Sequence, residues 1–174
     1  MTTKTQAKSG LVFEVGQSIV YPAHGVGSIT AIETQTVAGM ELEVYVVSFD
    51  QDKMILRVPT NRAEASGMRA LAGSKLVDDA LKTLGGRARI KRTMWSRRAQ
   101  EYETKIKSGD PVSIAEVVRD LHRRTNQSEQ SYSERQLYES ALDRMARELA
   151  AVENIDRDTA MDRLAASLAK KKAA

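Results

Sequence analysis

The residues with the clearest chemical potential in this chain gather around its single tryptophan, Trp95. Between positions 87 and 107 the sequence carries eight Lys or Arg residues and two Glu residues, which gives this segment a net charge of +6. The whole chain has only +4, so the remainder sums to −2. Cations that flank one large aromatic ring are typical of a surface that binds nucleic acid, because cations neutralise phosphates while the ring stacks or wedges between bases.

The same segment also supports a purely structural interpretation. A helix is expected to begin near Thr93 or Met94 and to end at Ser108-Gly109. Four apolar residues recur in it at helical spacing and predict one buried stripe: Trp95, Ala99, Tyr102 and Ile106. On this interpretation the tryptophan is ordinary core, because tryptophan side chains are mostly buried. A ring in the first helical turn can nevertheless pack on the core and still present an edge to a partner.

The sequence shows no recognisable catalytic or metal-binding pattern. It contains no cysteine, and its two histidines, His24 and His122, stand far apart without a neighbouring ligand motif. It has no Gly-x-Ser-x-Gly nucleophile elbow and no phosphate-binding loop of the correct spacing. We therefore expect neither an enzyme nor a protein that holds a metal or a cofactor.

The composition is that of a globular protein, with 41% hydrophobic and 29% charged residues among 174. No apolar run approaches the roughly 20 residues that cross a bilayer, so no membrane segment is expected. The polar start of the chain lacks the apolar region of a secretory signal, and the absence of cysteine fits a reducing compartment. We expect a cytoplasmic protein whose residues 1–11 and 170–174 form flexible tails.

Residues 12–60 predict a small β domain. Four short runs rich in Val, Ile, Thr and Tyr are separated by turn signals: Ser18–Tyr21, Gly27–Val37, Leu42–Asp50 and Met54–Val58. In the third run Leu42, Val44 and Val46 alternate with Glu or Tyr, as in a half-buried strand. The close spacing of the runs favours a Tudor-like or SH3-like β-barrel. Residues 1–62 hold five basic and six acidic residues, so this half should not bind phosphates.

Residues 61–169 predict a compact all-α domain of about five helices. Asn61–Ala65 and Ser74–Leu84 have helical composition, and Gly85-Gly86 ends the second of these segments. Later helix starts carry capping signals at Asp110-Pro111, Ser131 and Asp156. Together the two halves predict an α+β fold, with a barrel followed by a helical domain.

Five stretches of the chain resemble the CarD (CdnL) family of bacterial transcription regulators. The first is VGQSIVYPAHGVG at Val15–Gly27, which the family shares with the polymerase-binding module of transcription-repair coupling factors. The others follow in family order: Ile32–Thr36, Arg57–Pro59, Trp95–Arg98 and Ala115–Leu121. The resemblance covers roughly residues 12–168. The combination of the first stretch with the tryptophan block is specific to this family.

The resemblance implies that the N-terminal domain binds the β subunit of bacterial RNA polymerase, in the holoenzyme with the housekeeping sigma factor, partly through a strand edge. It implies four contact positions there: Gln35, Val47, Arg57 and Pro59. Gln35 stands where some members have arginine, so one ionic anchor is absent. A monomer is expected.

The resemblance also implies that the helical domain stabilises the promoter open complex, chiefly activating housekeeping and rRNA promoters. Trp95 would wedge into the minor groove of promoter DNA at the upstream edge of the bubble, with low sequence specificity. The resemblance implies backbone contacts for three basic residues, Arg97, Arg98 and Arg135. The basic stripe around Trp95 adds two more candidates for contact with DNA, Lys91 and Arg92.

Two other functions remain open from the residues alone. The barrel could serve as a KOW-like RNA platform in a stand-alone RNA- or ribosome-associated protein, although the balanced charge of residues 1–62 disfavours this. Tyr21, Tyr45 and Phe49 could instead form an aromatic cage for a methylated peptide. A buried core stripe explains the same three residues more simply.

Overall fold

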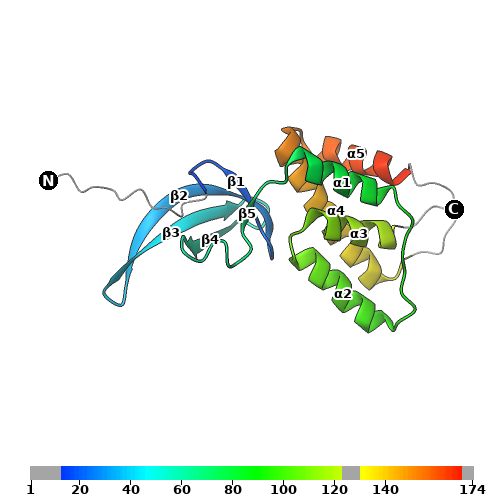
Figure 1. Cartoon of the computed structure of the whole chain (residues 1–174), viewed down its shortest axis with the longest axis horizontal. Helices are drawn as coiled ribbons and strands as arrows, with labels where there is room; N and C mark the ends of the chain where they lie inside the picture. Colours follow the sequence, from blue (N-terminus) through cyan, green and yellow to red (C-terminus); the bar gives the residue numbers. More distant parts are fainter. Residues whose placement is uncertain (1–12, 123–129, 170–174) are drawn as a thin grey trace.

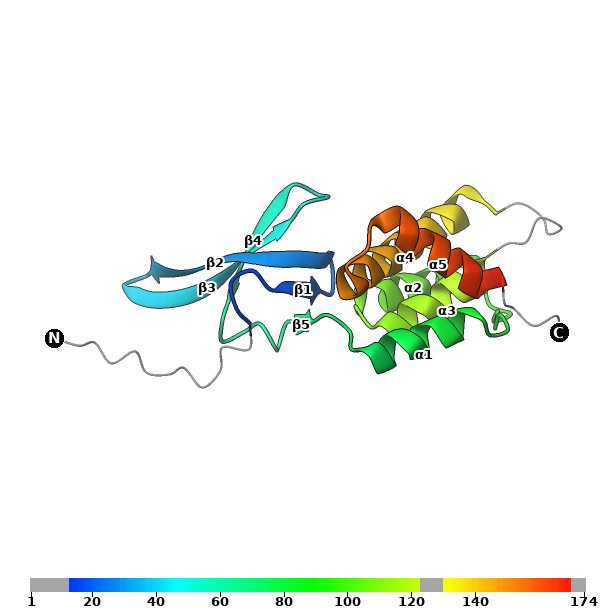
Figure 2. The same ribbon diagram turned by 90° about the horizontal axis from the view of Figure 1, so that it is seen from above.

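The computed structural model describes residues 13–122 and 130–169, and in it an antiparallel sheet lies beside a helical bundle (Figure 1). The strands are β1 Ser18–Tyr21, β2 Gly25–Val37, β3 Met40–Phe49, β4 Met54–Pro59 and β5 Arg69–Ala70. The helices are α1 Ser74–Leu84, α2 Trp95–Lys107, α3 Pro111–Leu121, α4 Tyr132–Glu153 and α5 Arg157–Ala169. A 90° turn shows the same separation of sheet and helices (Figure 2). The predicted fold class, a small β domain followed by an α domain, is confirmed.

The sheet is open and does not close into the predicted barrel. Its strand order is β4-β3-β2-β1-β5, and within the described residues no pairing joins β4 to β5. A long β2–β3 hairpin projects away from the helices (Figures 1 and 2). One of the turn signals that separate the predicted strands, Ala38-Gly39, forms the turn of this hairpin, with φ of +52° and +79° as a two-residue hairpin turn requires. The outer edge of β4 is therefore left without a neighbouring strand in the described structure.

The core of the sheet lies on the opposite face of β3 from the one that the residue alternation indicated. Tyr45, Val47 and Phe49 are almost fully buried in it, and the Tyr45 ring meets the Phe13 ring edge-on at 5.6 Å between centroids. Val44 and Val46 are buried on the other face. Tyr45 and Phe49 are two residues away from Val47 on either side, so all three lie on the same face of the strand. Because the two aromatic rings bury more apolar area than valine, they decide which face turns inward.

The predicted helix at Asn61–Ala65 is wrong, because residues 60–67 form a series of turns. Ala63 and Met68 are buried in the sheet core, and the Met68 N–H donates to the Ala63 carbonyl at 3.2 Å. The chain then forms β5, which pairs with β1. The sheet region thus extends about ten residues beyond the predicted boundary at residue 60, since this segment is anchored by tertiary contacts that a local pattern does not reveal.

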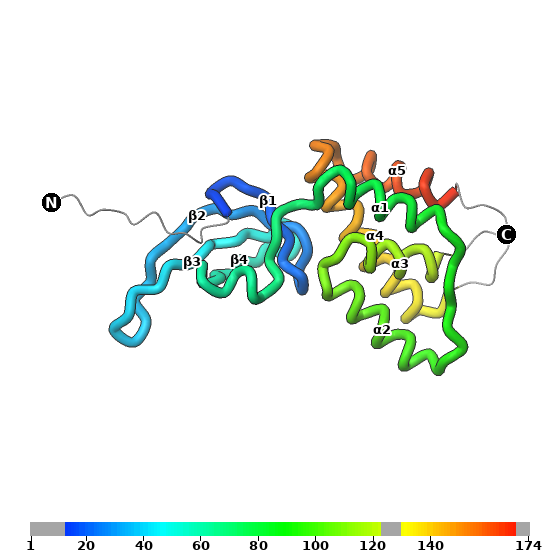
Figure 3. The backbone as a smooth tube through the Cα atoms, viewed as in Figure 1, coloured from blue at the N-terminus to red at the C-terminus, as the bar shows by residue number. Residues whose placement is uncertain are grey.

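The helical bundle follows the capping signals in the sequence. Each predicted cap accepts a backbone N–H three residues further on: Asp110 from Ser113, Ser131 from Glu134 and Asp156 from Thr159. All five helices contribute to one apolar core. Helix α2 begins at the end of the bundle far from the sheet and ends beside the sheet (Figure 3). No helix in the described ranges is long and apolar enough to span a membrane.

Candidate nucleic-acid interface

Trp95 is the first residue of α2, and its side chain is half-buried. The indole packs against the helical core, with its centroid 6.3 Å from that of the buried Tyr102 ring. The guanidinium of Arg98 lies over the indole at 5.3 Å from the ring centroid, a cation–π geometry. The ring therefore belongs to the predicted core stripe, and part of its surface reaches solvent at the end of the bundle.

Arg98 contacts both aromatic side chains of this pair, Trp95 and Tyr102. Besides covering Trp95, it interacts with the hydroxyl of Tyr102. Burial raises the pKa of this hydroxyl, the carboxylate of Asp120 raises it further, and Arg98 opposes both effects. This position suits a residue that fixes the orientation of the indole better than one that reaches out to a phosphate.

Three of the predicted DNA-binding cations are available to a partner. Arg92, Arg97 and Arg135 are exposed, and in the described part of the chain none of their side chains has a hydrogen bond or an ion pair. Arg92 and Arg97 lie within three residues of Trp95, whereas Arg135 is in the first turn of α4. An unpaired guanidinium can bind phosphate without first breaking an internal contact.

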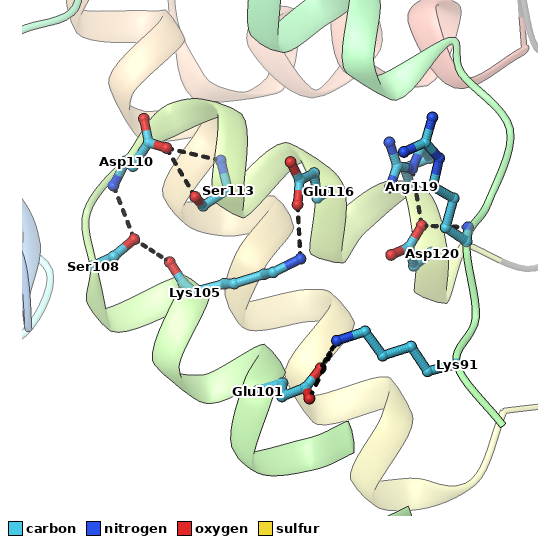
Figure 4. Close-up of polar contacts among 10 residues, drawn as sticks. Lys91, Glu101, Lys105, Ser108, Asp110, Ser113, Glu116, Arg119 and Asp120 are labelled. Atoms are coloured by element: carbon cyan, nitrogen blue, oxygen red, sulfur yellow. Dashed lines mark hydrogen bonds and ion pairs between the residues drawn. The ribbon is translucent and has the colours of Figure 1, made fainter. Parts of the chain in front are cut away.

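Two other cations of this segment, Lys91 and Lys105, are already paired (Figure 4). Lys91 contacts Glu101 at 3.1 Å, and because both side chains are about half exposed this pair contributes little to stability. Lys105 contacts Glu116 on α3 at 2.7 Å. Nearby, the buried Asp120 accepts bonds from the Arg119 side chain at 2.8 Å and from the Arg89 backbone at 2.9 Å. The net charge of +6 thus overstates the charge that is free to meet DNA.

Three of the four predicted polymerase-binding residues share one face of the sheet. The register pairs Gln35 with Leu42, Pro59 with Val44 and Arg57 with Val46, so all of these lie on the face opposite the core. Arg57 is half exposed and lies 3.7 Å from Glu33, a loose ion pair. Ile55, also exposed, extends this face along the edge strand β4.

Val47 does not belong to that face. Its side chain has no exposed surface and packs in the sheet core, so in this structure it does not line the surface formed by Gln35, Arg57 and Pro59. Its strand, β3, is also paired on both sides. The aromatic cage is contradicted for a similar reason, because Tyr45 and Phe49 are buried in the same core and present no open ring face to a methylated peptide.

The two predicted surfaces lie at a distance from each other, on either side of a junction held by Arg144 of α4. This guanidinium donates to the carbonyl of Pro22 at 2.6 Å and of Ile106 at 2.9 Å, and also to that of Ala23. It therefore joins the β1–β2 turn to the last turn of α2. Burial lowers the pKa of Arg144, as expected for a charge withdrawn from water.

A second arginine reinforces the junction. Arg69 of β5 donates to both carboxylate oxygens of Glu148, at 2.7 and 2.8 Å, and to the carbonyl of Gly109 at 2.5 Å. Glu148 is buried and also accepts the N–H of Ala72 at 2.9 Å. This bidentate pair satisfies both groups at a point where the chain passes from sheet to helices.

Two glycines make room for the β1–β2 turn at this junction. A Cβ at Gly67 would lie 2.8 Å from the Pro22 ring, and one at Gly109 would lie 3.1 Å from the Pro22 Cα. Both glycines also have positive φ, +86° and +73°. Side chains at these positions would push Pro22 away, so the close fit of the two regions depends on glycine.

The junction was not predicted, although the sequence holds one indirect signal. Arg144 and Glu148 fall among the apolar residues of α4 at helical spacing from Ala141 and Met145, where a charged residue must find a partner. The partners themselves are 38, 121 and 122 residues away for Arg144, and 76 and 79 residues away for Glu148. Such separations leave no local pattern.

Comparison with known proteins covers both regions. The family model described as "CarD-like/TRCF RID domain" matches residues 13–72, and the one described as "CarD, C-terminal domain" matches residues 79–165. The putative transcription factor YdeB of Bacillus subtilis (strain 168) is 28% identical over 144 residues, which cover 83% of this chain and 94% of YdeB. The first match ends within a few residues of β5, in agreement with the extended sheet region.

Proposed function

Because the chain belongs to the CarD family, we propose that it holds bacterial RNA polymerase with its sheet and stabilises the promoter open complex with the first turn of α2. At the level of the family, the chain is a transcription regulator that acts on RNA polymerase. The observation that carries the finer proposal is a half-buried indole, fixed at a helix end beside Arg92 and Arg97, whose side chains have no partner among the described residues.

The indole acts as a wedge at the upstream edge of the melted DNA. Its packing on Arg98 and Tyr102 holds it in place before DNA arrives, so little side-chain entropy is lost on contact. A rigid ring fits an unstacked, widened duplex better than a closed one, and it therefore shifts the population toward the open complex. A differential contact of about 1.4 kcal/mol lengthens the lifetime of that complex about tenfold.

Two further contacts place the indole at the promoter: arginines that bind the DNA backbone, and the attachment to polymerase. Arg92 and Arg97 bind backbone phosphates, which positions the wedge without reading bases, so sequence specificity is low. Attachment to polymerase supplies a high effective concentration at every promoter, so that intrinsic DNA affinity can be weak. Promoters whose open complexes are short-lived gain most from this stabilisation, and the resemblance to the family points to housekeeping and rRNA promoters as the main targets.

The sheet contacts the β subunit of the housekeeping holoenzyme through β4 and the face beside it. This assignment is supported by the unpaired edge of β4 and by the exposed side chains of Ile55 and Arg57. An added strand from the partner can hydrogen-bond to such an edge, while side chains on the face supply specificity.

The wedge is tested by Trp95→Ala in the full chain with polymerase holoenzyme and an rRNA promoter. We expect binding to polymerase to be unchanged and the open-complex lifetime to fall about tenfold, the effect of losing about 1.4 kcal/mol. Trp95→Phe should give a lifetime between those of the unmodified chain and Trp95→Ala, because a smaller ring fills less of the gap. Tyr132→Ala, which removes another exposed aromatic ring of the helical region, serves as the matched control. A lifetime for Trp95→Ala equal to that of the unmodified chain would overturn the proposal.

The polymerase contact is tested by Arg57→Glu in a pull-down of the β subunit. We expect capture to be lost. The double variant Arg57→Glu/Glu33→Arg restores an ion pair on the sheet with reversed polarity. If capture is lost because Arg57 contacts the partner, the double variant should not regain it; if capture is lost because the internal pair is broken, it should. Undiminished capture by the single variant, or full recovery by the double variant, would contradict the assignment.

A further inference from the structure

Met94 is one of the three most exposed large hydrophobic residues in the described structure, with 75% of its surface accessible. It immediately precedes Trp95 at the start of α2. Its backbone is fixed, because its carbonyl accepts the N–H groups of Arg97 and Arg98, both at 3.1 Å. The thioether side chain therefore projects from an ordered position beside the indole.

Neither packing nor helix capping explains a methionine at this position. Its side chain is not part of the helical core. It occupies the N-cap of α2, where it cannot accept a backbone N–H, and the helix has no side-chain cap. By contrast, α3 and α4 begin with the capping side chains of Asp110 and Ser131. A polar residue would serve the fold better here.

We propose that Met94 is a second apolar contact for opened promoter DNA, seated beside Trp95 against the unstacked bases. This inference rests on the proposed function and deepens it. The indole is half-buried, so it offers only part of its surface to DNA. Methionine is among the side chains that wedge between base steps, and its unbranched thioether adapts to an irregular gap.

The charge around Met94 selects DNA as the occupant of this exposed apolar surface. Arg92 and Arg97 flank it, both exposed and without side-chain partners among the described residues. The equally exposed Met40, with 73% of its surface accessible, lies at the tip of the β2–β3 hairpin, and the residues next to it include Glu41. Phosphates on both sides of a widened step would therefore find flanking arginines at Met94 and none next to Met40.

The first test is Met94→Ser, which should raise the stability of the protein but shorten the lifetime of the open complex. Serine caps α2, so the thermal midpoint should rise by about 2 to 4 °C. The open-complex lifetime should nevertheless fall about threefold, because the apolar contact with the bases is lost. Met94→Leu should retain the lifetime, and Met40→Ser should leave it unchanged.

The outcomes separate this inference from the function on which it rests. If Trp95→Ala shortens the lifetime and Met94→Ser does not, Met94 is an exposed residue without a role in DNA contact. If neither variant shortens it, the proposed function fails as well. A shortened lifetime with both Met94→Ser and Met40→Ser would also overturn the inference, since the effect would not be specific to this position.

A second test locates the contact directly. The chain contains no cysteine, so Met94→Cys creates a single thiol that can carry a photoactivated cross-linker. In the full promoter complex we expect adducts on bases at the upstream edge of the bubble, and none from Met40→Cys. Adducts confined to protein, or absent from that edge, would overturn the proposal.

Discussion

The arginines at the junction and the arginines near the first turn of α2 are used in opposite ways. Arg69 and Arg144 are surrounded by carbonyl and carboxylate oxygens that belong to the same chain. Arg92 and Arg97 have no such partners in the described residues. A guanidinium whose donors are satisfied internally stabilises the fold, whereas an unsatisfied exposed one can bind a phosphate. The number of cations in a segment therefore says less than how many remain free.

The junction also fixes the distance between the two surfaces of this small protein, the sheet and the first turn of α2. The junction joins the β1–β2 turn to the last turn of α2, and Trp95 is the first residue of the same helix. Trp95 precedes Ile106 by 11 residues, which at about 1.5 Å each place the first residue of α2 about 17 Å along the helix from the junction contact. A fixed junction thus sets the position of the indole relative to the sheet that is proposed to hold polymerase.

The largest effect is expected from removing the buried carboxylate of the junction. Glu148→Ala leaves the charge of Arg69 and the N–H of Ala72 without their acceptor, and should lower the free energy of unfolding by about 3 kcal/mol. Urea unfolding measures this loss. As a control, Glu101→Ala breaks the exposed pair with Lys91 and should change stability by about 0.5 kcal/mol or less. Equal losses of stability in Glu148→Ala and Glu101→Ala would show that the buried pair at the junction is no more stabilising than the exposed pair near α2.

A smaller change in stability, with a specific change in geometry, is expected for Arg144→Met. Three carbonyls lose their donor, which should cost about 1 to 2 kcal/mol and loosen the junction. Spin labels on Met40→Cys and Glu103→Cys, in this cysteine-free chain, report the distance between sheet and helices. We expect a broader distance distribution in the variant. Arg147→Met is the matched control, because the ion pair that Arg147 forms in the described structure, with Asp143, lies within α4. Distributions of equal width would show that Arg144 does not fix the junction.

The smallest effect is expected at single phosphate contacts, where it sharpens the contrast between free and paired cations. Arg97→Gln should reduce the slope of log binding against log salt by about 1 for the promoter complex. Lys91→Gln should reduce it less, since Lys91 already contacts Glu101. Titrating the polymerase–promoter complex with salt measures both slopes. A larger effect at Lys91 than at Arg97 would reverse the assignment.

The features predicted correctly from the sequence are those that depend on near neighbours. The caps at Asp110, Ser131 and Asp156 act over three residues, and the stripe of Tyr102 and Ile106 repeats within one helix. A pattern of nearby residues carries this information because the interactions themselves are local.

The features that were missed depend on distant parts of the chain. The burial of Val47 was hidden because Val44 and Val46 are also apolar, so alternation alone did not show which face turns inward. The short segment at residues 60–67 takes its shape from the sheet core that it contacts. The partners of Arg144 could not be read from the sequence, since they lie 38, 121 and 122 residues away from it.

The central claim is that Trp95 keeps the upstream edge of the promoter bubble unstacked, and one measurement reads this directly. 2-Aminopurine placed at that edge becomes brighter when its base is unstacked. With polymerase saturated by the protein, we predict a higher steady-state fluorescence for the unmodified chain than for Trp95→Ala, although both variants bind polymerase equally. The same fluorescence with both proteins would contradict the account.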